Sequence, residues 1–393
     1  MSVPALRFKE FTSSWTSNKV GDICDFIVPG RNKPKNFDGE LPWITTPDIE
    51  QSGVINYSKK NLNISKEEAK TVGSKVVPKN SIIISCVGDL GLVAITGREL
   101  VINQQLHAFI PKETVYFRFL LFALIIQKPY MEMVATKTAV PYMNKDNCNS
   151  IPVVMPSLAE QTKIANFLTA VDEKITQLSQ KCELITQYKK GVMQQIFSQK
   201  LRFKGDDGQD FPDWEQKRLG DISKFFSGGT PLTTNKSFYN GNIAFIKSGE
   251  ISAERTAQFI TEIGLKGSSA KMVSSGDLLY ALYGATSGEV AISRISGAIN
   301  QAVLCIRSKL NTYYLYSYLR HMKSSILETY LQGGQGNLSA EIIKSLVLPC
   351  PNDNEQNKIA NFLTAIDDKL THTQNQLAAA KQYKQGLLQQ MFV

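Results

Sequence analysis

The stretch EQTKIANFLTA at residues 160–170 occurs again as EQNKIANFLTA at residues 355–365. The two copies continue without a gap to residues 197 and 392, and twenty of the 38 paired positions are identical at a constant offset of 195. Shorter repeats lie outside this block, namely Leu-Arg-Phe-Lys at residues 6–9 and 201–204 and Ile-Asn-Gln at residues 102–104 and 299–301. The chain of 393 residues therefore contains two copies of one unit.

Each long repeat predicts a long helix. Ser157 and Asn352 stand three residues before a glutamate, which is typical of a helix start. Apolar residues then recur at spacings of four and three through residues 164–196 and 359–391, the period of a coiled-coil seam. An amphipathic helix packed on its own globule is the alternative, but a seam that continues for five heptads favours the coiled coil.

Chain geometry predicts that the two helices run antiparallel. A helix of about 40 residues is about 60 Å long. The segment that joins the two helices has a radius of gyration of about 15 Å if it is one domain, which is too small to bridge the ends of a parallel pair. We therefore expect a pseudo-twofold arrangement with one globule at each end of a rod.

The segments between the helices predict mixed α/β globules. Short strand-like runs such as residues 81–87 and 278–283 alternate with helical patterns such as residues 116–126 and 313–321. The predicted organisation is a first globule at 1–155, a central helix at 156–200, a second globule at 201–350 and a C-terminal helix at 351–393. The fold class is thus mixed α/β, with two globules joined by a long antiparallel two-helix coiled coil.

Composition excludes several classes of protein. No apolar run reaches the length of a membrane span, so neither export nor a membrane partner is expected. The six cysteines form no C-x-x-C pair and are interpreted as buried thiols in a reducing cytoplasm. The net charge of +9 permits binding to a polyanion.

Motifs for catalysis are missing. The chain has no phosphate-binding loop, and the glycine-rich residues 332–337 are interpreted as a flexible loop. The stretch at 212–217 only superficially resembles a nuclease signature and is interpreted as a structural turn. The three histidines have no metal-ligand spacing. We therefore predict no catalytic residue and no metal site, and binding outranks catalysis.

Two related but diverged globules suit a double-stranded DNA target with two half-sites. Phosphates are met by Lys and Arg, and base edges by polar side chains, so polar and basic loops are the candidates. In the first globule they are Arg31, Lys33, Lys35, Asn36, Lys137, Thr138, Tyr142 and Asn144. In the second they are Thr230, Thr233, Thr234, Asn235, Lys236, Lys247, Gln332, Gln335 and Asn337.

Taken together, these features resemble the specificity subunit of a type I restriction-modification enzyme. The resemblance covers essentially the whole chain and rests on Pro156, Glu160-Gln161, Lys189-x-Gly191, Gln194-Gln195, Leu201-Arg202-Phe203, Trp214, Gly220-Asp221-Ile222, Gly276-Asp277, Gly284, Asn300-Gln301 and their first-half counterparts. It implies two target-recognition domains that each read one half of a bipartite DNA target.

The resemblance also implies partners. Two methyltransferase subunits would methylate adenine with S-adenosylmethionine, and restriction subunits would translocate and cleave DNA with ATP and Mg²⁺. This chain would itself be non-catalytic and carry no cofactor. Within the first helix, residues off the seam match their repeats, which predicts that two copies of one partner dock there; shared ancestry without selection is the alternative. The candidates are Glu160, Gln161, Lys163, Asn166, Thr169, Glu355, Gln356, Lys358, Asn361 and Thr364.

Three other functions remain open from the sequence. A stand-alone bipartite DNA-binding regulator would have the same architecture and bind DNA without a partner. A coiled-coil scaffold would show no DNA preference and would not need two diverged globules. A hidden nuclease or methyltransferase would require the motifs that are missing.

Overall fold

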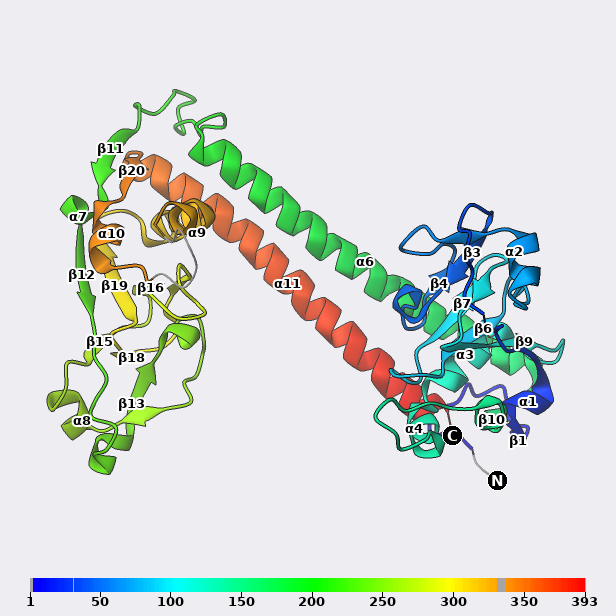
Figure 1. The fold of residues 1–393 in the computed structure, drawn as a ribbon. Helices are drawn as coiled ribbons and strands as arrows, with labels where there is room; N and C mark the ends of the chain where they lie inside the picture. The colour runs from blue at the N-terminus through cyan, green and yellow to red at the C-terminus, as the bar shows by residue number, and fades with distance from the viewer. Residues whose placement is uncertain (1–2, 31, 331–336, 393) are drawn as a thin grey trace. The chain divides into compact units, whose positions relative to one another are not determined.

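The computed structural model describes residues 3–30, 32–330 and 337–392 and divides into two compact units (Figure 1). The first unit comprises Met1–Ser179 and Asn375–Val393, and the second comprises Gln180–Gln374. Each unit thus combines one globule with parts of both long helices, α6 (Leu158–Phe197) and α11 (Asp353–Met391). The repeated sequence blocks are distributed over both units.

The globule of the first unit has three sheets. Strands β1 (Thr16–Lys19) and β10 (Pro152–Met155) form an antiparallel pair. The largest sheet has the order β2 (Cys24–Ile27), β9 (Leu106–Pro111), β6 (Ile82–Ser85), β7 (Val93–Thr96) and β4 (Val54–Ile55). The third has the order β5 (Asn63–Ile64), β3 (Leu41–Ile44) and β8 (Val101–Ile102). The helices are α1 (Val20–Ile23), η1 (Thr46–Asp48), α2 (Lys66–Thr71), α3 (Phe117–Ile125), α4 (Lys128–Val134) and α5 (Lys145–Asn149).

The globule of the second unit repeats this plan. Strand β11 (Glu215–Arg218) pairs with β20 (Val347–Cys350). One sheet has the order β12 (Ser223–Ser227), β19 (Val303–Ser308), β16 (Leu278–Ala281) and β17 (Val290–Ile292). The other has the order β14 (Phe259–Ile260), β13 (Tyr239–Ile246), β18 (Gly297–Ile299) and β15 (Lys271–Val273). The helices are α7 (Leu219–Ile222), η2 (Lys236–Phe238), η3 (Ser248–Glu250), α8 (Glu262–Lys266), α9 (Thr312–Tyr330) and α10 (Ala340–Ser345).

The two globules share their strand pairings, so the sequence repeat is also a structural repeat. The run β2-β9-β6-β7 matches β12-β19-β16-β17, and the parallel pair β3 with β8 matches β13 with β18. The first unit has a further parallel pair, β4 with β7. The expected mixed α/β class is confirmed in each unit.

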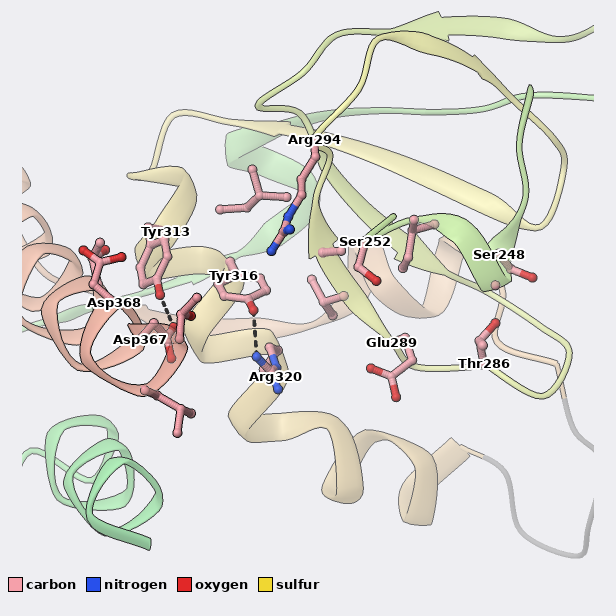
Figure 2. A pocket seen from close by; sticks show the side chains of 18 residues that line it. Ser248, Ser252, Thr286, Glu289, Arg294, Tyr313, Tyr316, Arg320, Asp367 and Asp368 are labelled. Atoms are coloured by element: carbon pink, nitrogen blue, oxygen red, sulfur yellow. Dashed lines mark hydrogen bonds between the residues drawn. The ribbon is translucent and has the colours of Figure 1, made fainter. Parts of the chain in front are cut away.

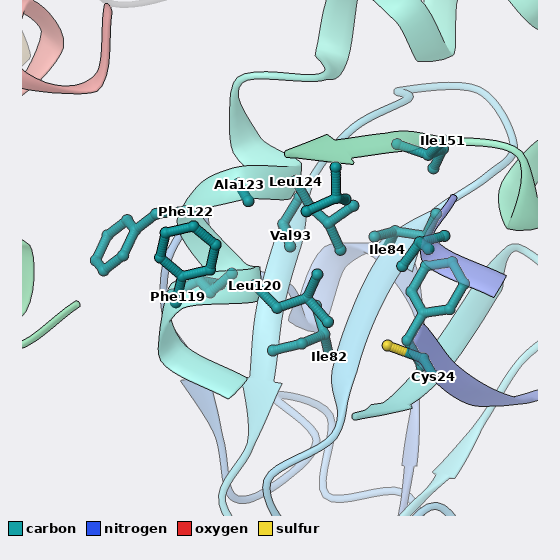
Figure 3. Packing of buried hydrophobic residues seen from close by; sticks show 14 of the residues in the cluster. Cys24, Ile82, Ile84, Val93, Phe119, Leu120, Phe122, Ala123, Leu124 and Ile151 are labelled. Atoms are coloured by element: carbon teal, nitrogen blue, oxygen red, sulfur yellow. The ribbon is translucent and has the colours of Figure 1, made fainter. Parts of the chain in front are cut away.

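The first core forms because strand β6 is apolar on both faces. Ile82 and Ile84 point toward α3, whereas Ile83 belongs to a second cluster on the opposite face of the sheet. Helix α3 presents a continuous apolar run, and Figure 3 shows Phe119, Leu120 and their neighbours against these strands. Full burial of each such side chain contributes about 1.5–3 kcal/mol.

The starts of α6 and α11 are capped as the sequence predicts. Glu160 N donates to Ser157 Oγ (3.4 Å), and Glu355 N donates to Asn352 Oδ1 (2.9 Å). Every expected seam position is buried or half-buried. The cysteines are all free thiols; five are buried, but Cys182 is half-buried, so the interpretation of that cysteine as buried is wrong. Cys182 lies on α6 outside either globule core, where the seam packs less deeply.

Within the first unit, the early part of α6 packs beside the late part of α11. Ile164 and Leu168 share the globule core with Leu387 and Met391. Farther along, Lys384 Nζ lies 2.6 Å from Asp172 Oδ1. As α6 numbers rise, α11 numbers fall, so the helices are antiparallel. These seam residues also belong to the core of the globule. The ends of the two helices therefore pack on a globule, as the alternative from the sequence expects, as well as on each other.

The second unit shows the same pairing with the helices exchanged. Ile359 and Leu363 of α11 share a core with Val192 and Ile196 of α6. Lys189 Nζ lies 2.5 Å from Asp367 Oδ1. This ion pair is the repeat of Lys384 with Asp172. The predicted antiparallel arrangement is therefore confirmed within each unit.

The segment Leu-Arg-Phe-Lys is hydrogen-bonded to a helix end in both units, that of α11 in the first and that of α6 in the second. Leu6 N donates to Gln390 O (2.8 Å), and Leu201 N donates to Gln195 O (3.1 Å), two acceptors that are repeats of each other. Phe8 then packs edge-on against Phe167, as Phe203 does against Phe362. Among the helices in the described part of the chain, none is long and apolar enough to cross a bilayer.

Candidate functional site

Two parallel strands end side by side in each unit and place the same short motif at that edge. Residues after the carboxyl ends of adjacent parallel strands meet at one edge of a sheet. Asn103 follows β8, and its N donates to Ile44 O at the end of β3 (2.9 Å). Asn300 follows β18, and its N donates to Ile246 O at the end of β13 (3.3 Å). We call residues 103–105 and 300–302 the Asn-Gln turns.

The asparagine of each turn shapes the backbone. Asn103 Oδ1 accepts from Gln105 N (3.2 Å), and Asn300 Oδ1 accepts from Ala302 N (3.1 Å). This bond to the amide two residues on is the Asx turn that asparagine favours. The following residues, Gln104 and Gln301, are exposed. Each turn therefore holds a glutamine on the surface.

The loop after β2 or β12 lies against the Asn-Gln turn. In the first unit, Lys33 lines a hollow of about 310 Å³ together with Trp43 and the three turn residues. In the second unit, Gly228 N donates to Asn300 O (3.3 Å), and Thr230 Oγ1 donates to Gln301 Oε1 (2.7 Å). The predicted DNA-binding residues Lys33 and Thr230 therefore lie at equivalent places.

A second segment, around Met143 in the first unit, is connected to the turn by two consecutive backbone hydrogen bonds, which we call a relay. Met143 N donates to Cys86 O, and Cys86 N donates to Gln105 O, both at 2.8 Å. The second unit has the same relay, from Leu338 through Leu282 to Ala302, at 2.9 and 2.8 Å. The predicted residues Tyr142, Asn144 and Asn337 adjoin these relays in sequence.

A third predicted element is the turn after β13. Lys247 follows β13 directly and is exposed, and η3 begins at the next residue. The equivalent of η3 in the first unit is η1, which begins at Thr46. Thr46 Oγ1 donates to Gln105 Oε1 (3.3 Å). In each unit, residues far apart in sequence thus surround one Asn-Gln turn.

The other predicted DNA-binding residues lie on the same loops. All described candidates are exposed except the half-buried Asn235: Lys33, Lys35, Asn36, Lys137, Thr138, Tyr142, Asn144, Thr230, Thr233, Thr234, Lys236, Lys247 and Asn337. Asn144 Oδ1 and Asn235 Oδ1 cap helices by accepting from Asn147 N and Ser237 N, and Thr138 Oγ1 donates to Val140 O (2.7 Å). These three therefore shape their own loops. Arg31, Gln332 and Gln335 lie outside the described residues.

The helix starts form a buried polar cluster in each unit. Arg7 Nε and Nη2 donate to the Glu160 carboxylate at 2.7 and 2.8 Å. Arg202 Nε and Nη2 donate to Glu355 at 3.0 and 2.8 Å, and Trp214 Nε1 adds a bond of 2.8 Å. These hydrogen bonds to Glu355 raise the pKa of Arg202.

The neighbouring glutamines also bond within the chain. Gln161 Oε1 accepts from Tyr116 N (2.9 Å), and its Nε2 donates to Pro156 O (3.0 Å). Gln356 Oε1 accepts from Asn311 N (2.7 Å), and its Nε2 donates to Pro351 O (2.8 Å). Each glutamine therefore ties a helix start to the segment that precedes α3 or α9.

The carboxylates and glutamines that the sequence predicts as partner-docking residues are buried in the structure. Glu160, Gln161, Glu355 and Gln356 are at most 3% exposed, and their polar atoms are used inside the unit. The glutamates repeat because each accepts from the arginine of Leu-Arg-Phe-Lys, and the glutamines repeat because each bonds to the segment before α3 or α9. The remaining candidates are exposed or half-buried on the helices: Lys163, Asn166, Thr169, Lys358, Asn361 and Thr364. Of these, Lys163 pairs with Glu10 and Lys358 with Asp206.

A hollow of about 540 Å³ lies in the second unit beside α9, β17 and α11 (Figure 2). The Tyr313 hydroxyl donates to Asp367, and Arg320 Nη1 donates to Tyr316 Oη (2.7 Å). Burial raises the pKa of Tyr313, so this phenol stays protonated at neutral pH. No histidine or cysteine is among the residues that line the hollow. Its lining is mixed in charge, with Glu289, Asp367 and Asp368 beside Arg294 and Arg320.

The described part of the chain contains no group of three or more His, Cys, Asp or Glu side chains suited to hold a metal ion. The nuclease-like stretch is also accounted for structurally. Trp214 fills the core, and Glu215 pairs with Lys217 along strand β11 (2.7 Å). Its second half, from Glu215 on, lies in β11 rather than in the predicted turn.

Comparisons with known proteins agree with this architecture. The family model for the type I restriction modification DNA specificity domain matches residues 12–187 and 212–382. The specificity subunit of the type I restriction enzyme MjaIX from Methanocaldococcus jannaschii is 23% identical over 387 residues, which cover 94% of this chain and 90% of that protein. The EcoR124I/EcoR124II specificity subunit from Escherichia coli is 26% identical over 233 residues, 55% of each chain.

Solved structures show the same fold. The S subunit of a type I restriction-modification system from M. genitalium superposes with a TM-score of 0.65 at 17% identity and covers 100% of this chain and 99% of its own. A second structure, from work on complex assembly and conformational transition of the type I R-M system, has a TM-score of 0.60 at 16% identity and covers 98% and 99%.

Proposed function

This chain belongs to the type I restriction modification DNA specificity family, and from that premise we propose that its two units read the two halves of a bipartite DNA target. Specificity subunits are non-catalytic DNA-recognition components. The observation that carries the proposal is the pair of Asn-Gln turns. The same backbone frame recurs in both units, but the loops around it carry different side chains, such as Lys33, Lys35 and Asn36 against Thr233, Thr234 and Lys236. One frame with two sets of side chains suits two different half-sites.

The helices are proposed to dock two methyltransferase subunits. The repeated surface residues Asn166 and Thr169 on α6 match Asn361 and Thr364 on α11, so two equivalent copies of one partner would find equivalent surfaces. Thr364 also lines the hollow of Figure 2. Adenine methylation with S-adenosylmethionine, and translocation and cleavage with ATP and Mg²⁺ by restriction subunits, would then be the work of these partners.

The test combines stoichiometry with a DNA library. The purified chain is mixed with its candidate methyltransferase, and the complex is assayed for methylation of a library of split targets. Assembly with two methyltransferase copies and methylation of one bipartite site supports the proposal. Specific DNA binding by the chain alone, without any interaction with the methyltransferase, would instead identify a stand-alone bipartite regulator. A chain that binds the partner but shows no DNA preference would identify a scaffold.

The docking surface has its own variants. Asn166→Ala with Thr169→Ala, or Asn361→Ala with Thr364→Ala, is expected to reduce the complex from two methyltransferase copies to one. The matched control is Gln177→Ala, which is exposed on the same helix but differs from its repeat, His372. Mass measurement of the intact complex reads the stoichiometry. Two copies retained in both double variants would contradict docking at these surfaces.

A further inference from the structure

Gln104 and Gln301 are identical in two units whose neighbouring loops differ. The asparagine before each of them is explained by its Asx turn, but that turn does not require glutamine at the next position. Both glutamines are exposed at the point where the predicted DNA-binding segments converge. A structural role in the core therefore does not account for the repeated glutamine.

We propose that the side chains of Gln104 and Gln301 each read an A·T pair, one in each half of the DNA target. This proposal rests on the proposed function and names a base-reading residue for each unit. A side-chain amide presents an NH₂ group that donates and a carbonyl oxygen that accepts, and together they match the N7 acceptor and N6 donor of adenine in the major groove. An identical residue in both units fits a base pair that both half-sites share, whereas the diverged loops fit the bases that differ.

The second unit shows how such an amide is oriented. Thr230 Oγ1 donates to Gln301 Oε1 at 2.7 Å. A carbonyl oxygen has two lone pairs, so Oε1 can accept from adenine N6 as well, and Nε2 is left to donate to N7. Thr230 is therefore a positioning residue for Gln301.

The geometry of the first unit supplies space for a base edge. The hollow of about 310 Å³ is walled by Gln104, Gln105, Trp43 and Lys33. Trp43 offers an apolar wall, and Lys33 offers a cation for a nearby phosphate. A recess with an amide at its wall and a lysine beside it suits a nucleotide better than a protein side chain.

The experiment measures base preference at every position of both half-sites. Complexes of the full chain with its methyltransferase are compared as wild type, Gln104→Glu and Gln301→Glu, because Glu keeps the shape of Gln but loses the amide donor. Gln104→Glu is expected to lose about tenfold or more of its preference for one A·T pair in the first half-site only. Gln301→Glu is expected to do the same in the second half-site only. Gln216→Ala, an exposed glutamine on β11, is the control and keeps both preferences.

Three outcomes overturn the inference. Unchanged base preferences in both variants would show that the glutamines do not read DNA. A uniform loss of methylation across all sequences would indicate a phosphate contact instead of base reading. Loss of preference at a base pair other than A·T would contradict the proposed match. Failure of the wild-type complex to methylate any split target would instead overturn the proposed function. If a Glu variant melts below wild type, Gln104→Ala and Gln301→Ala are scored by the same criteria.

Discussion

Glu355 is a fully buried carboxylate whose side chain is satisfied entirely by its own unit. Glu355→Ala leaves the Arg202 guanidinium and the Trp214 indole N–H without their acceptor. Loss of one partner of a buried pair costs about 3 kcal/mol. We expect the second unit to lose about that much stability, measured by chemical denaturation. Glu341→Ala, which removes an exposed pair with Lys344, is the control and is expected to be nearly neutral.

His107 predicts a pH dependence of the first unit. It lies in β9 between Phe26 and Phe109, and burial lowers its pKa to about 4. The unfolded chain binds this proton near pH 6.5, whereas the folded chain does not until about pH 4, so stability falls as pH falls through that window. The expected contribution is about 3 kcal/mol, seen as a drop in melting temperature below pH 6.5.

The matched variants separate His107 from other titrating groups. His107→Leu is expected to flatten the loss between pH 6.5 and pH 4. His372→Gln removes an exposed histidine on α11 and is expected to leave the profile unchanged. An equal pH profile in wild type and His107→Leu would exclude His107 as the source.

At the scale of elements, the two lysines in the seam of α6 and α11, Lys189 and Lys384, each form an ion pair with an aspartate of the other helix. The two pairs are Asp172 with Lys384 and Lys189 with Asp367, and all four side chains are half-buried. Each helix supplies one aspartate and one lysine. In an apolar seam such pairs fix the register, because a shift of one heptad would leave the lysine without an acceptor.

A double-mutant cycle tests the first pair. Asp172→Asn and Lys384→Met are expected to destabilise the first unit singly, and the double variant is expected to lose less than the sum by about 1 kcal/mol. Lys384 also lies over the Phe122 ring and near Ser52 Oγ, so Lys384→Met is expected to be the more costly single change. Urea denaturation of the four proteins gives the coupling, and strict additivity would show that the pair does not interact.

The elements were predictable to different degrees, for physical reasons. The two long helices were predicted correctly because their periodicity is local and is written twice. The internal contact of Glu160 was not predicted, because Arg7, which binds it, is 153 residues away in the sequence. Identity between repeats does not show whether a residue contacts its own chain or another protein. The off-seam residues Asn166 and Thr169 stay a prediction.

The candidate site was predicted only in its outer parts. Loops rich in Lys, Thr and Asn are recognisable from composition, and they supplied Lys33, Thr230 and Lys247. The Asn-Gln turn at the centre was noticed as a repeat but not as a site. Its position depends on the parallel pairing of β3 with β8, and strand pairing between distant segments is not encoded in any local pattern.

At the scale of the whole molecule, each long helix contains both members of the seam pair. Asp172 and Lys189 both belong to α6. The partner of Asp172 is Lys384, the repeat of Lys189, and the partner of Lys189 is Asp367, the repeat of Asp172. Gln195 is likewise the repeat of Gln390, which accepts from Leu6 N. A fragment of residues 1–200 thus contains the repeats of the residues on α11 that make these ion-pair and backbone contacts with its unit.

We therefore expect residues 1–200 to form an antiparallel homodimer. Asp172 of each copy would face Lys189 of the other, and light scattering after gel filtration would report twice the fragment mass. Asp172→Lys places two lysines together and is expected to raise the dissociation constant about tenfold, whereas adding Lys189→Asp restores the opposite charges and the dimer. A monomeric wild-type fragment, or a double variant no tighter than Asp172→Lys, would show that α6 pairs only with α11, and that the divergence between residues 177–186 and 372–381 makes each helix specific for the other.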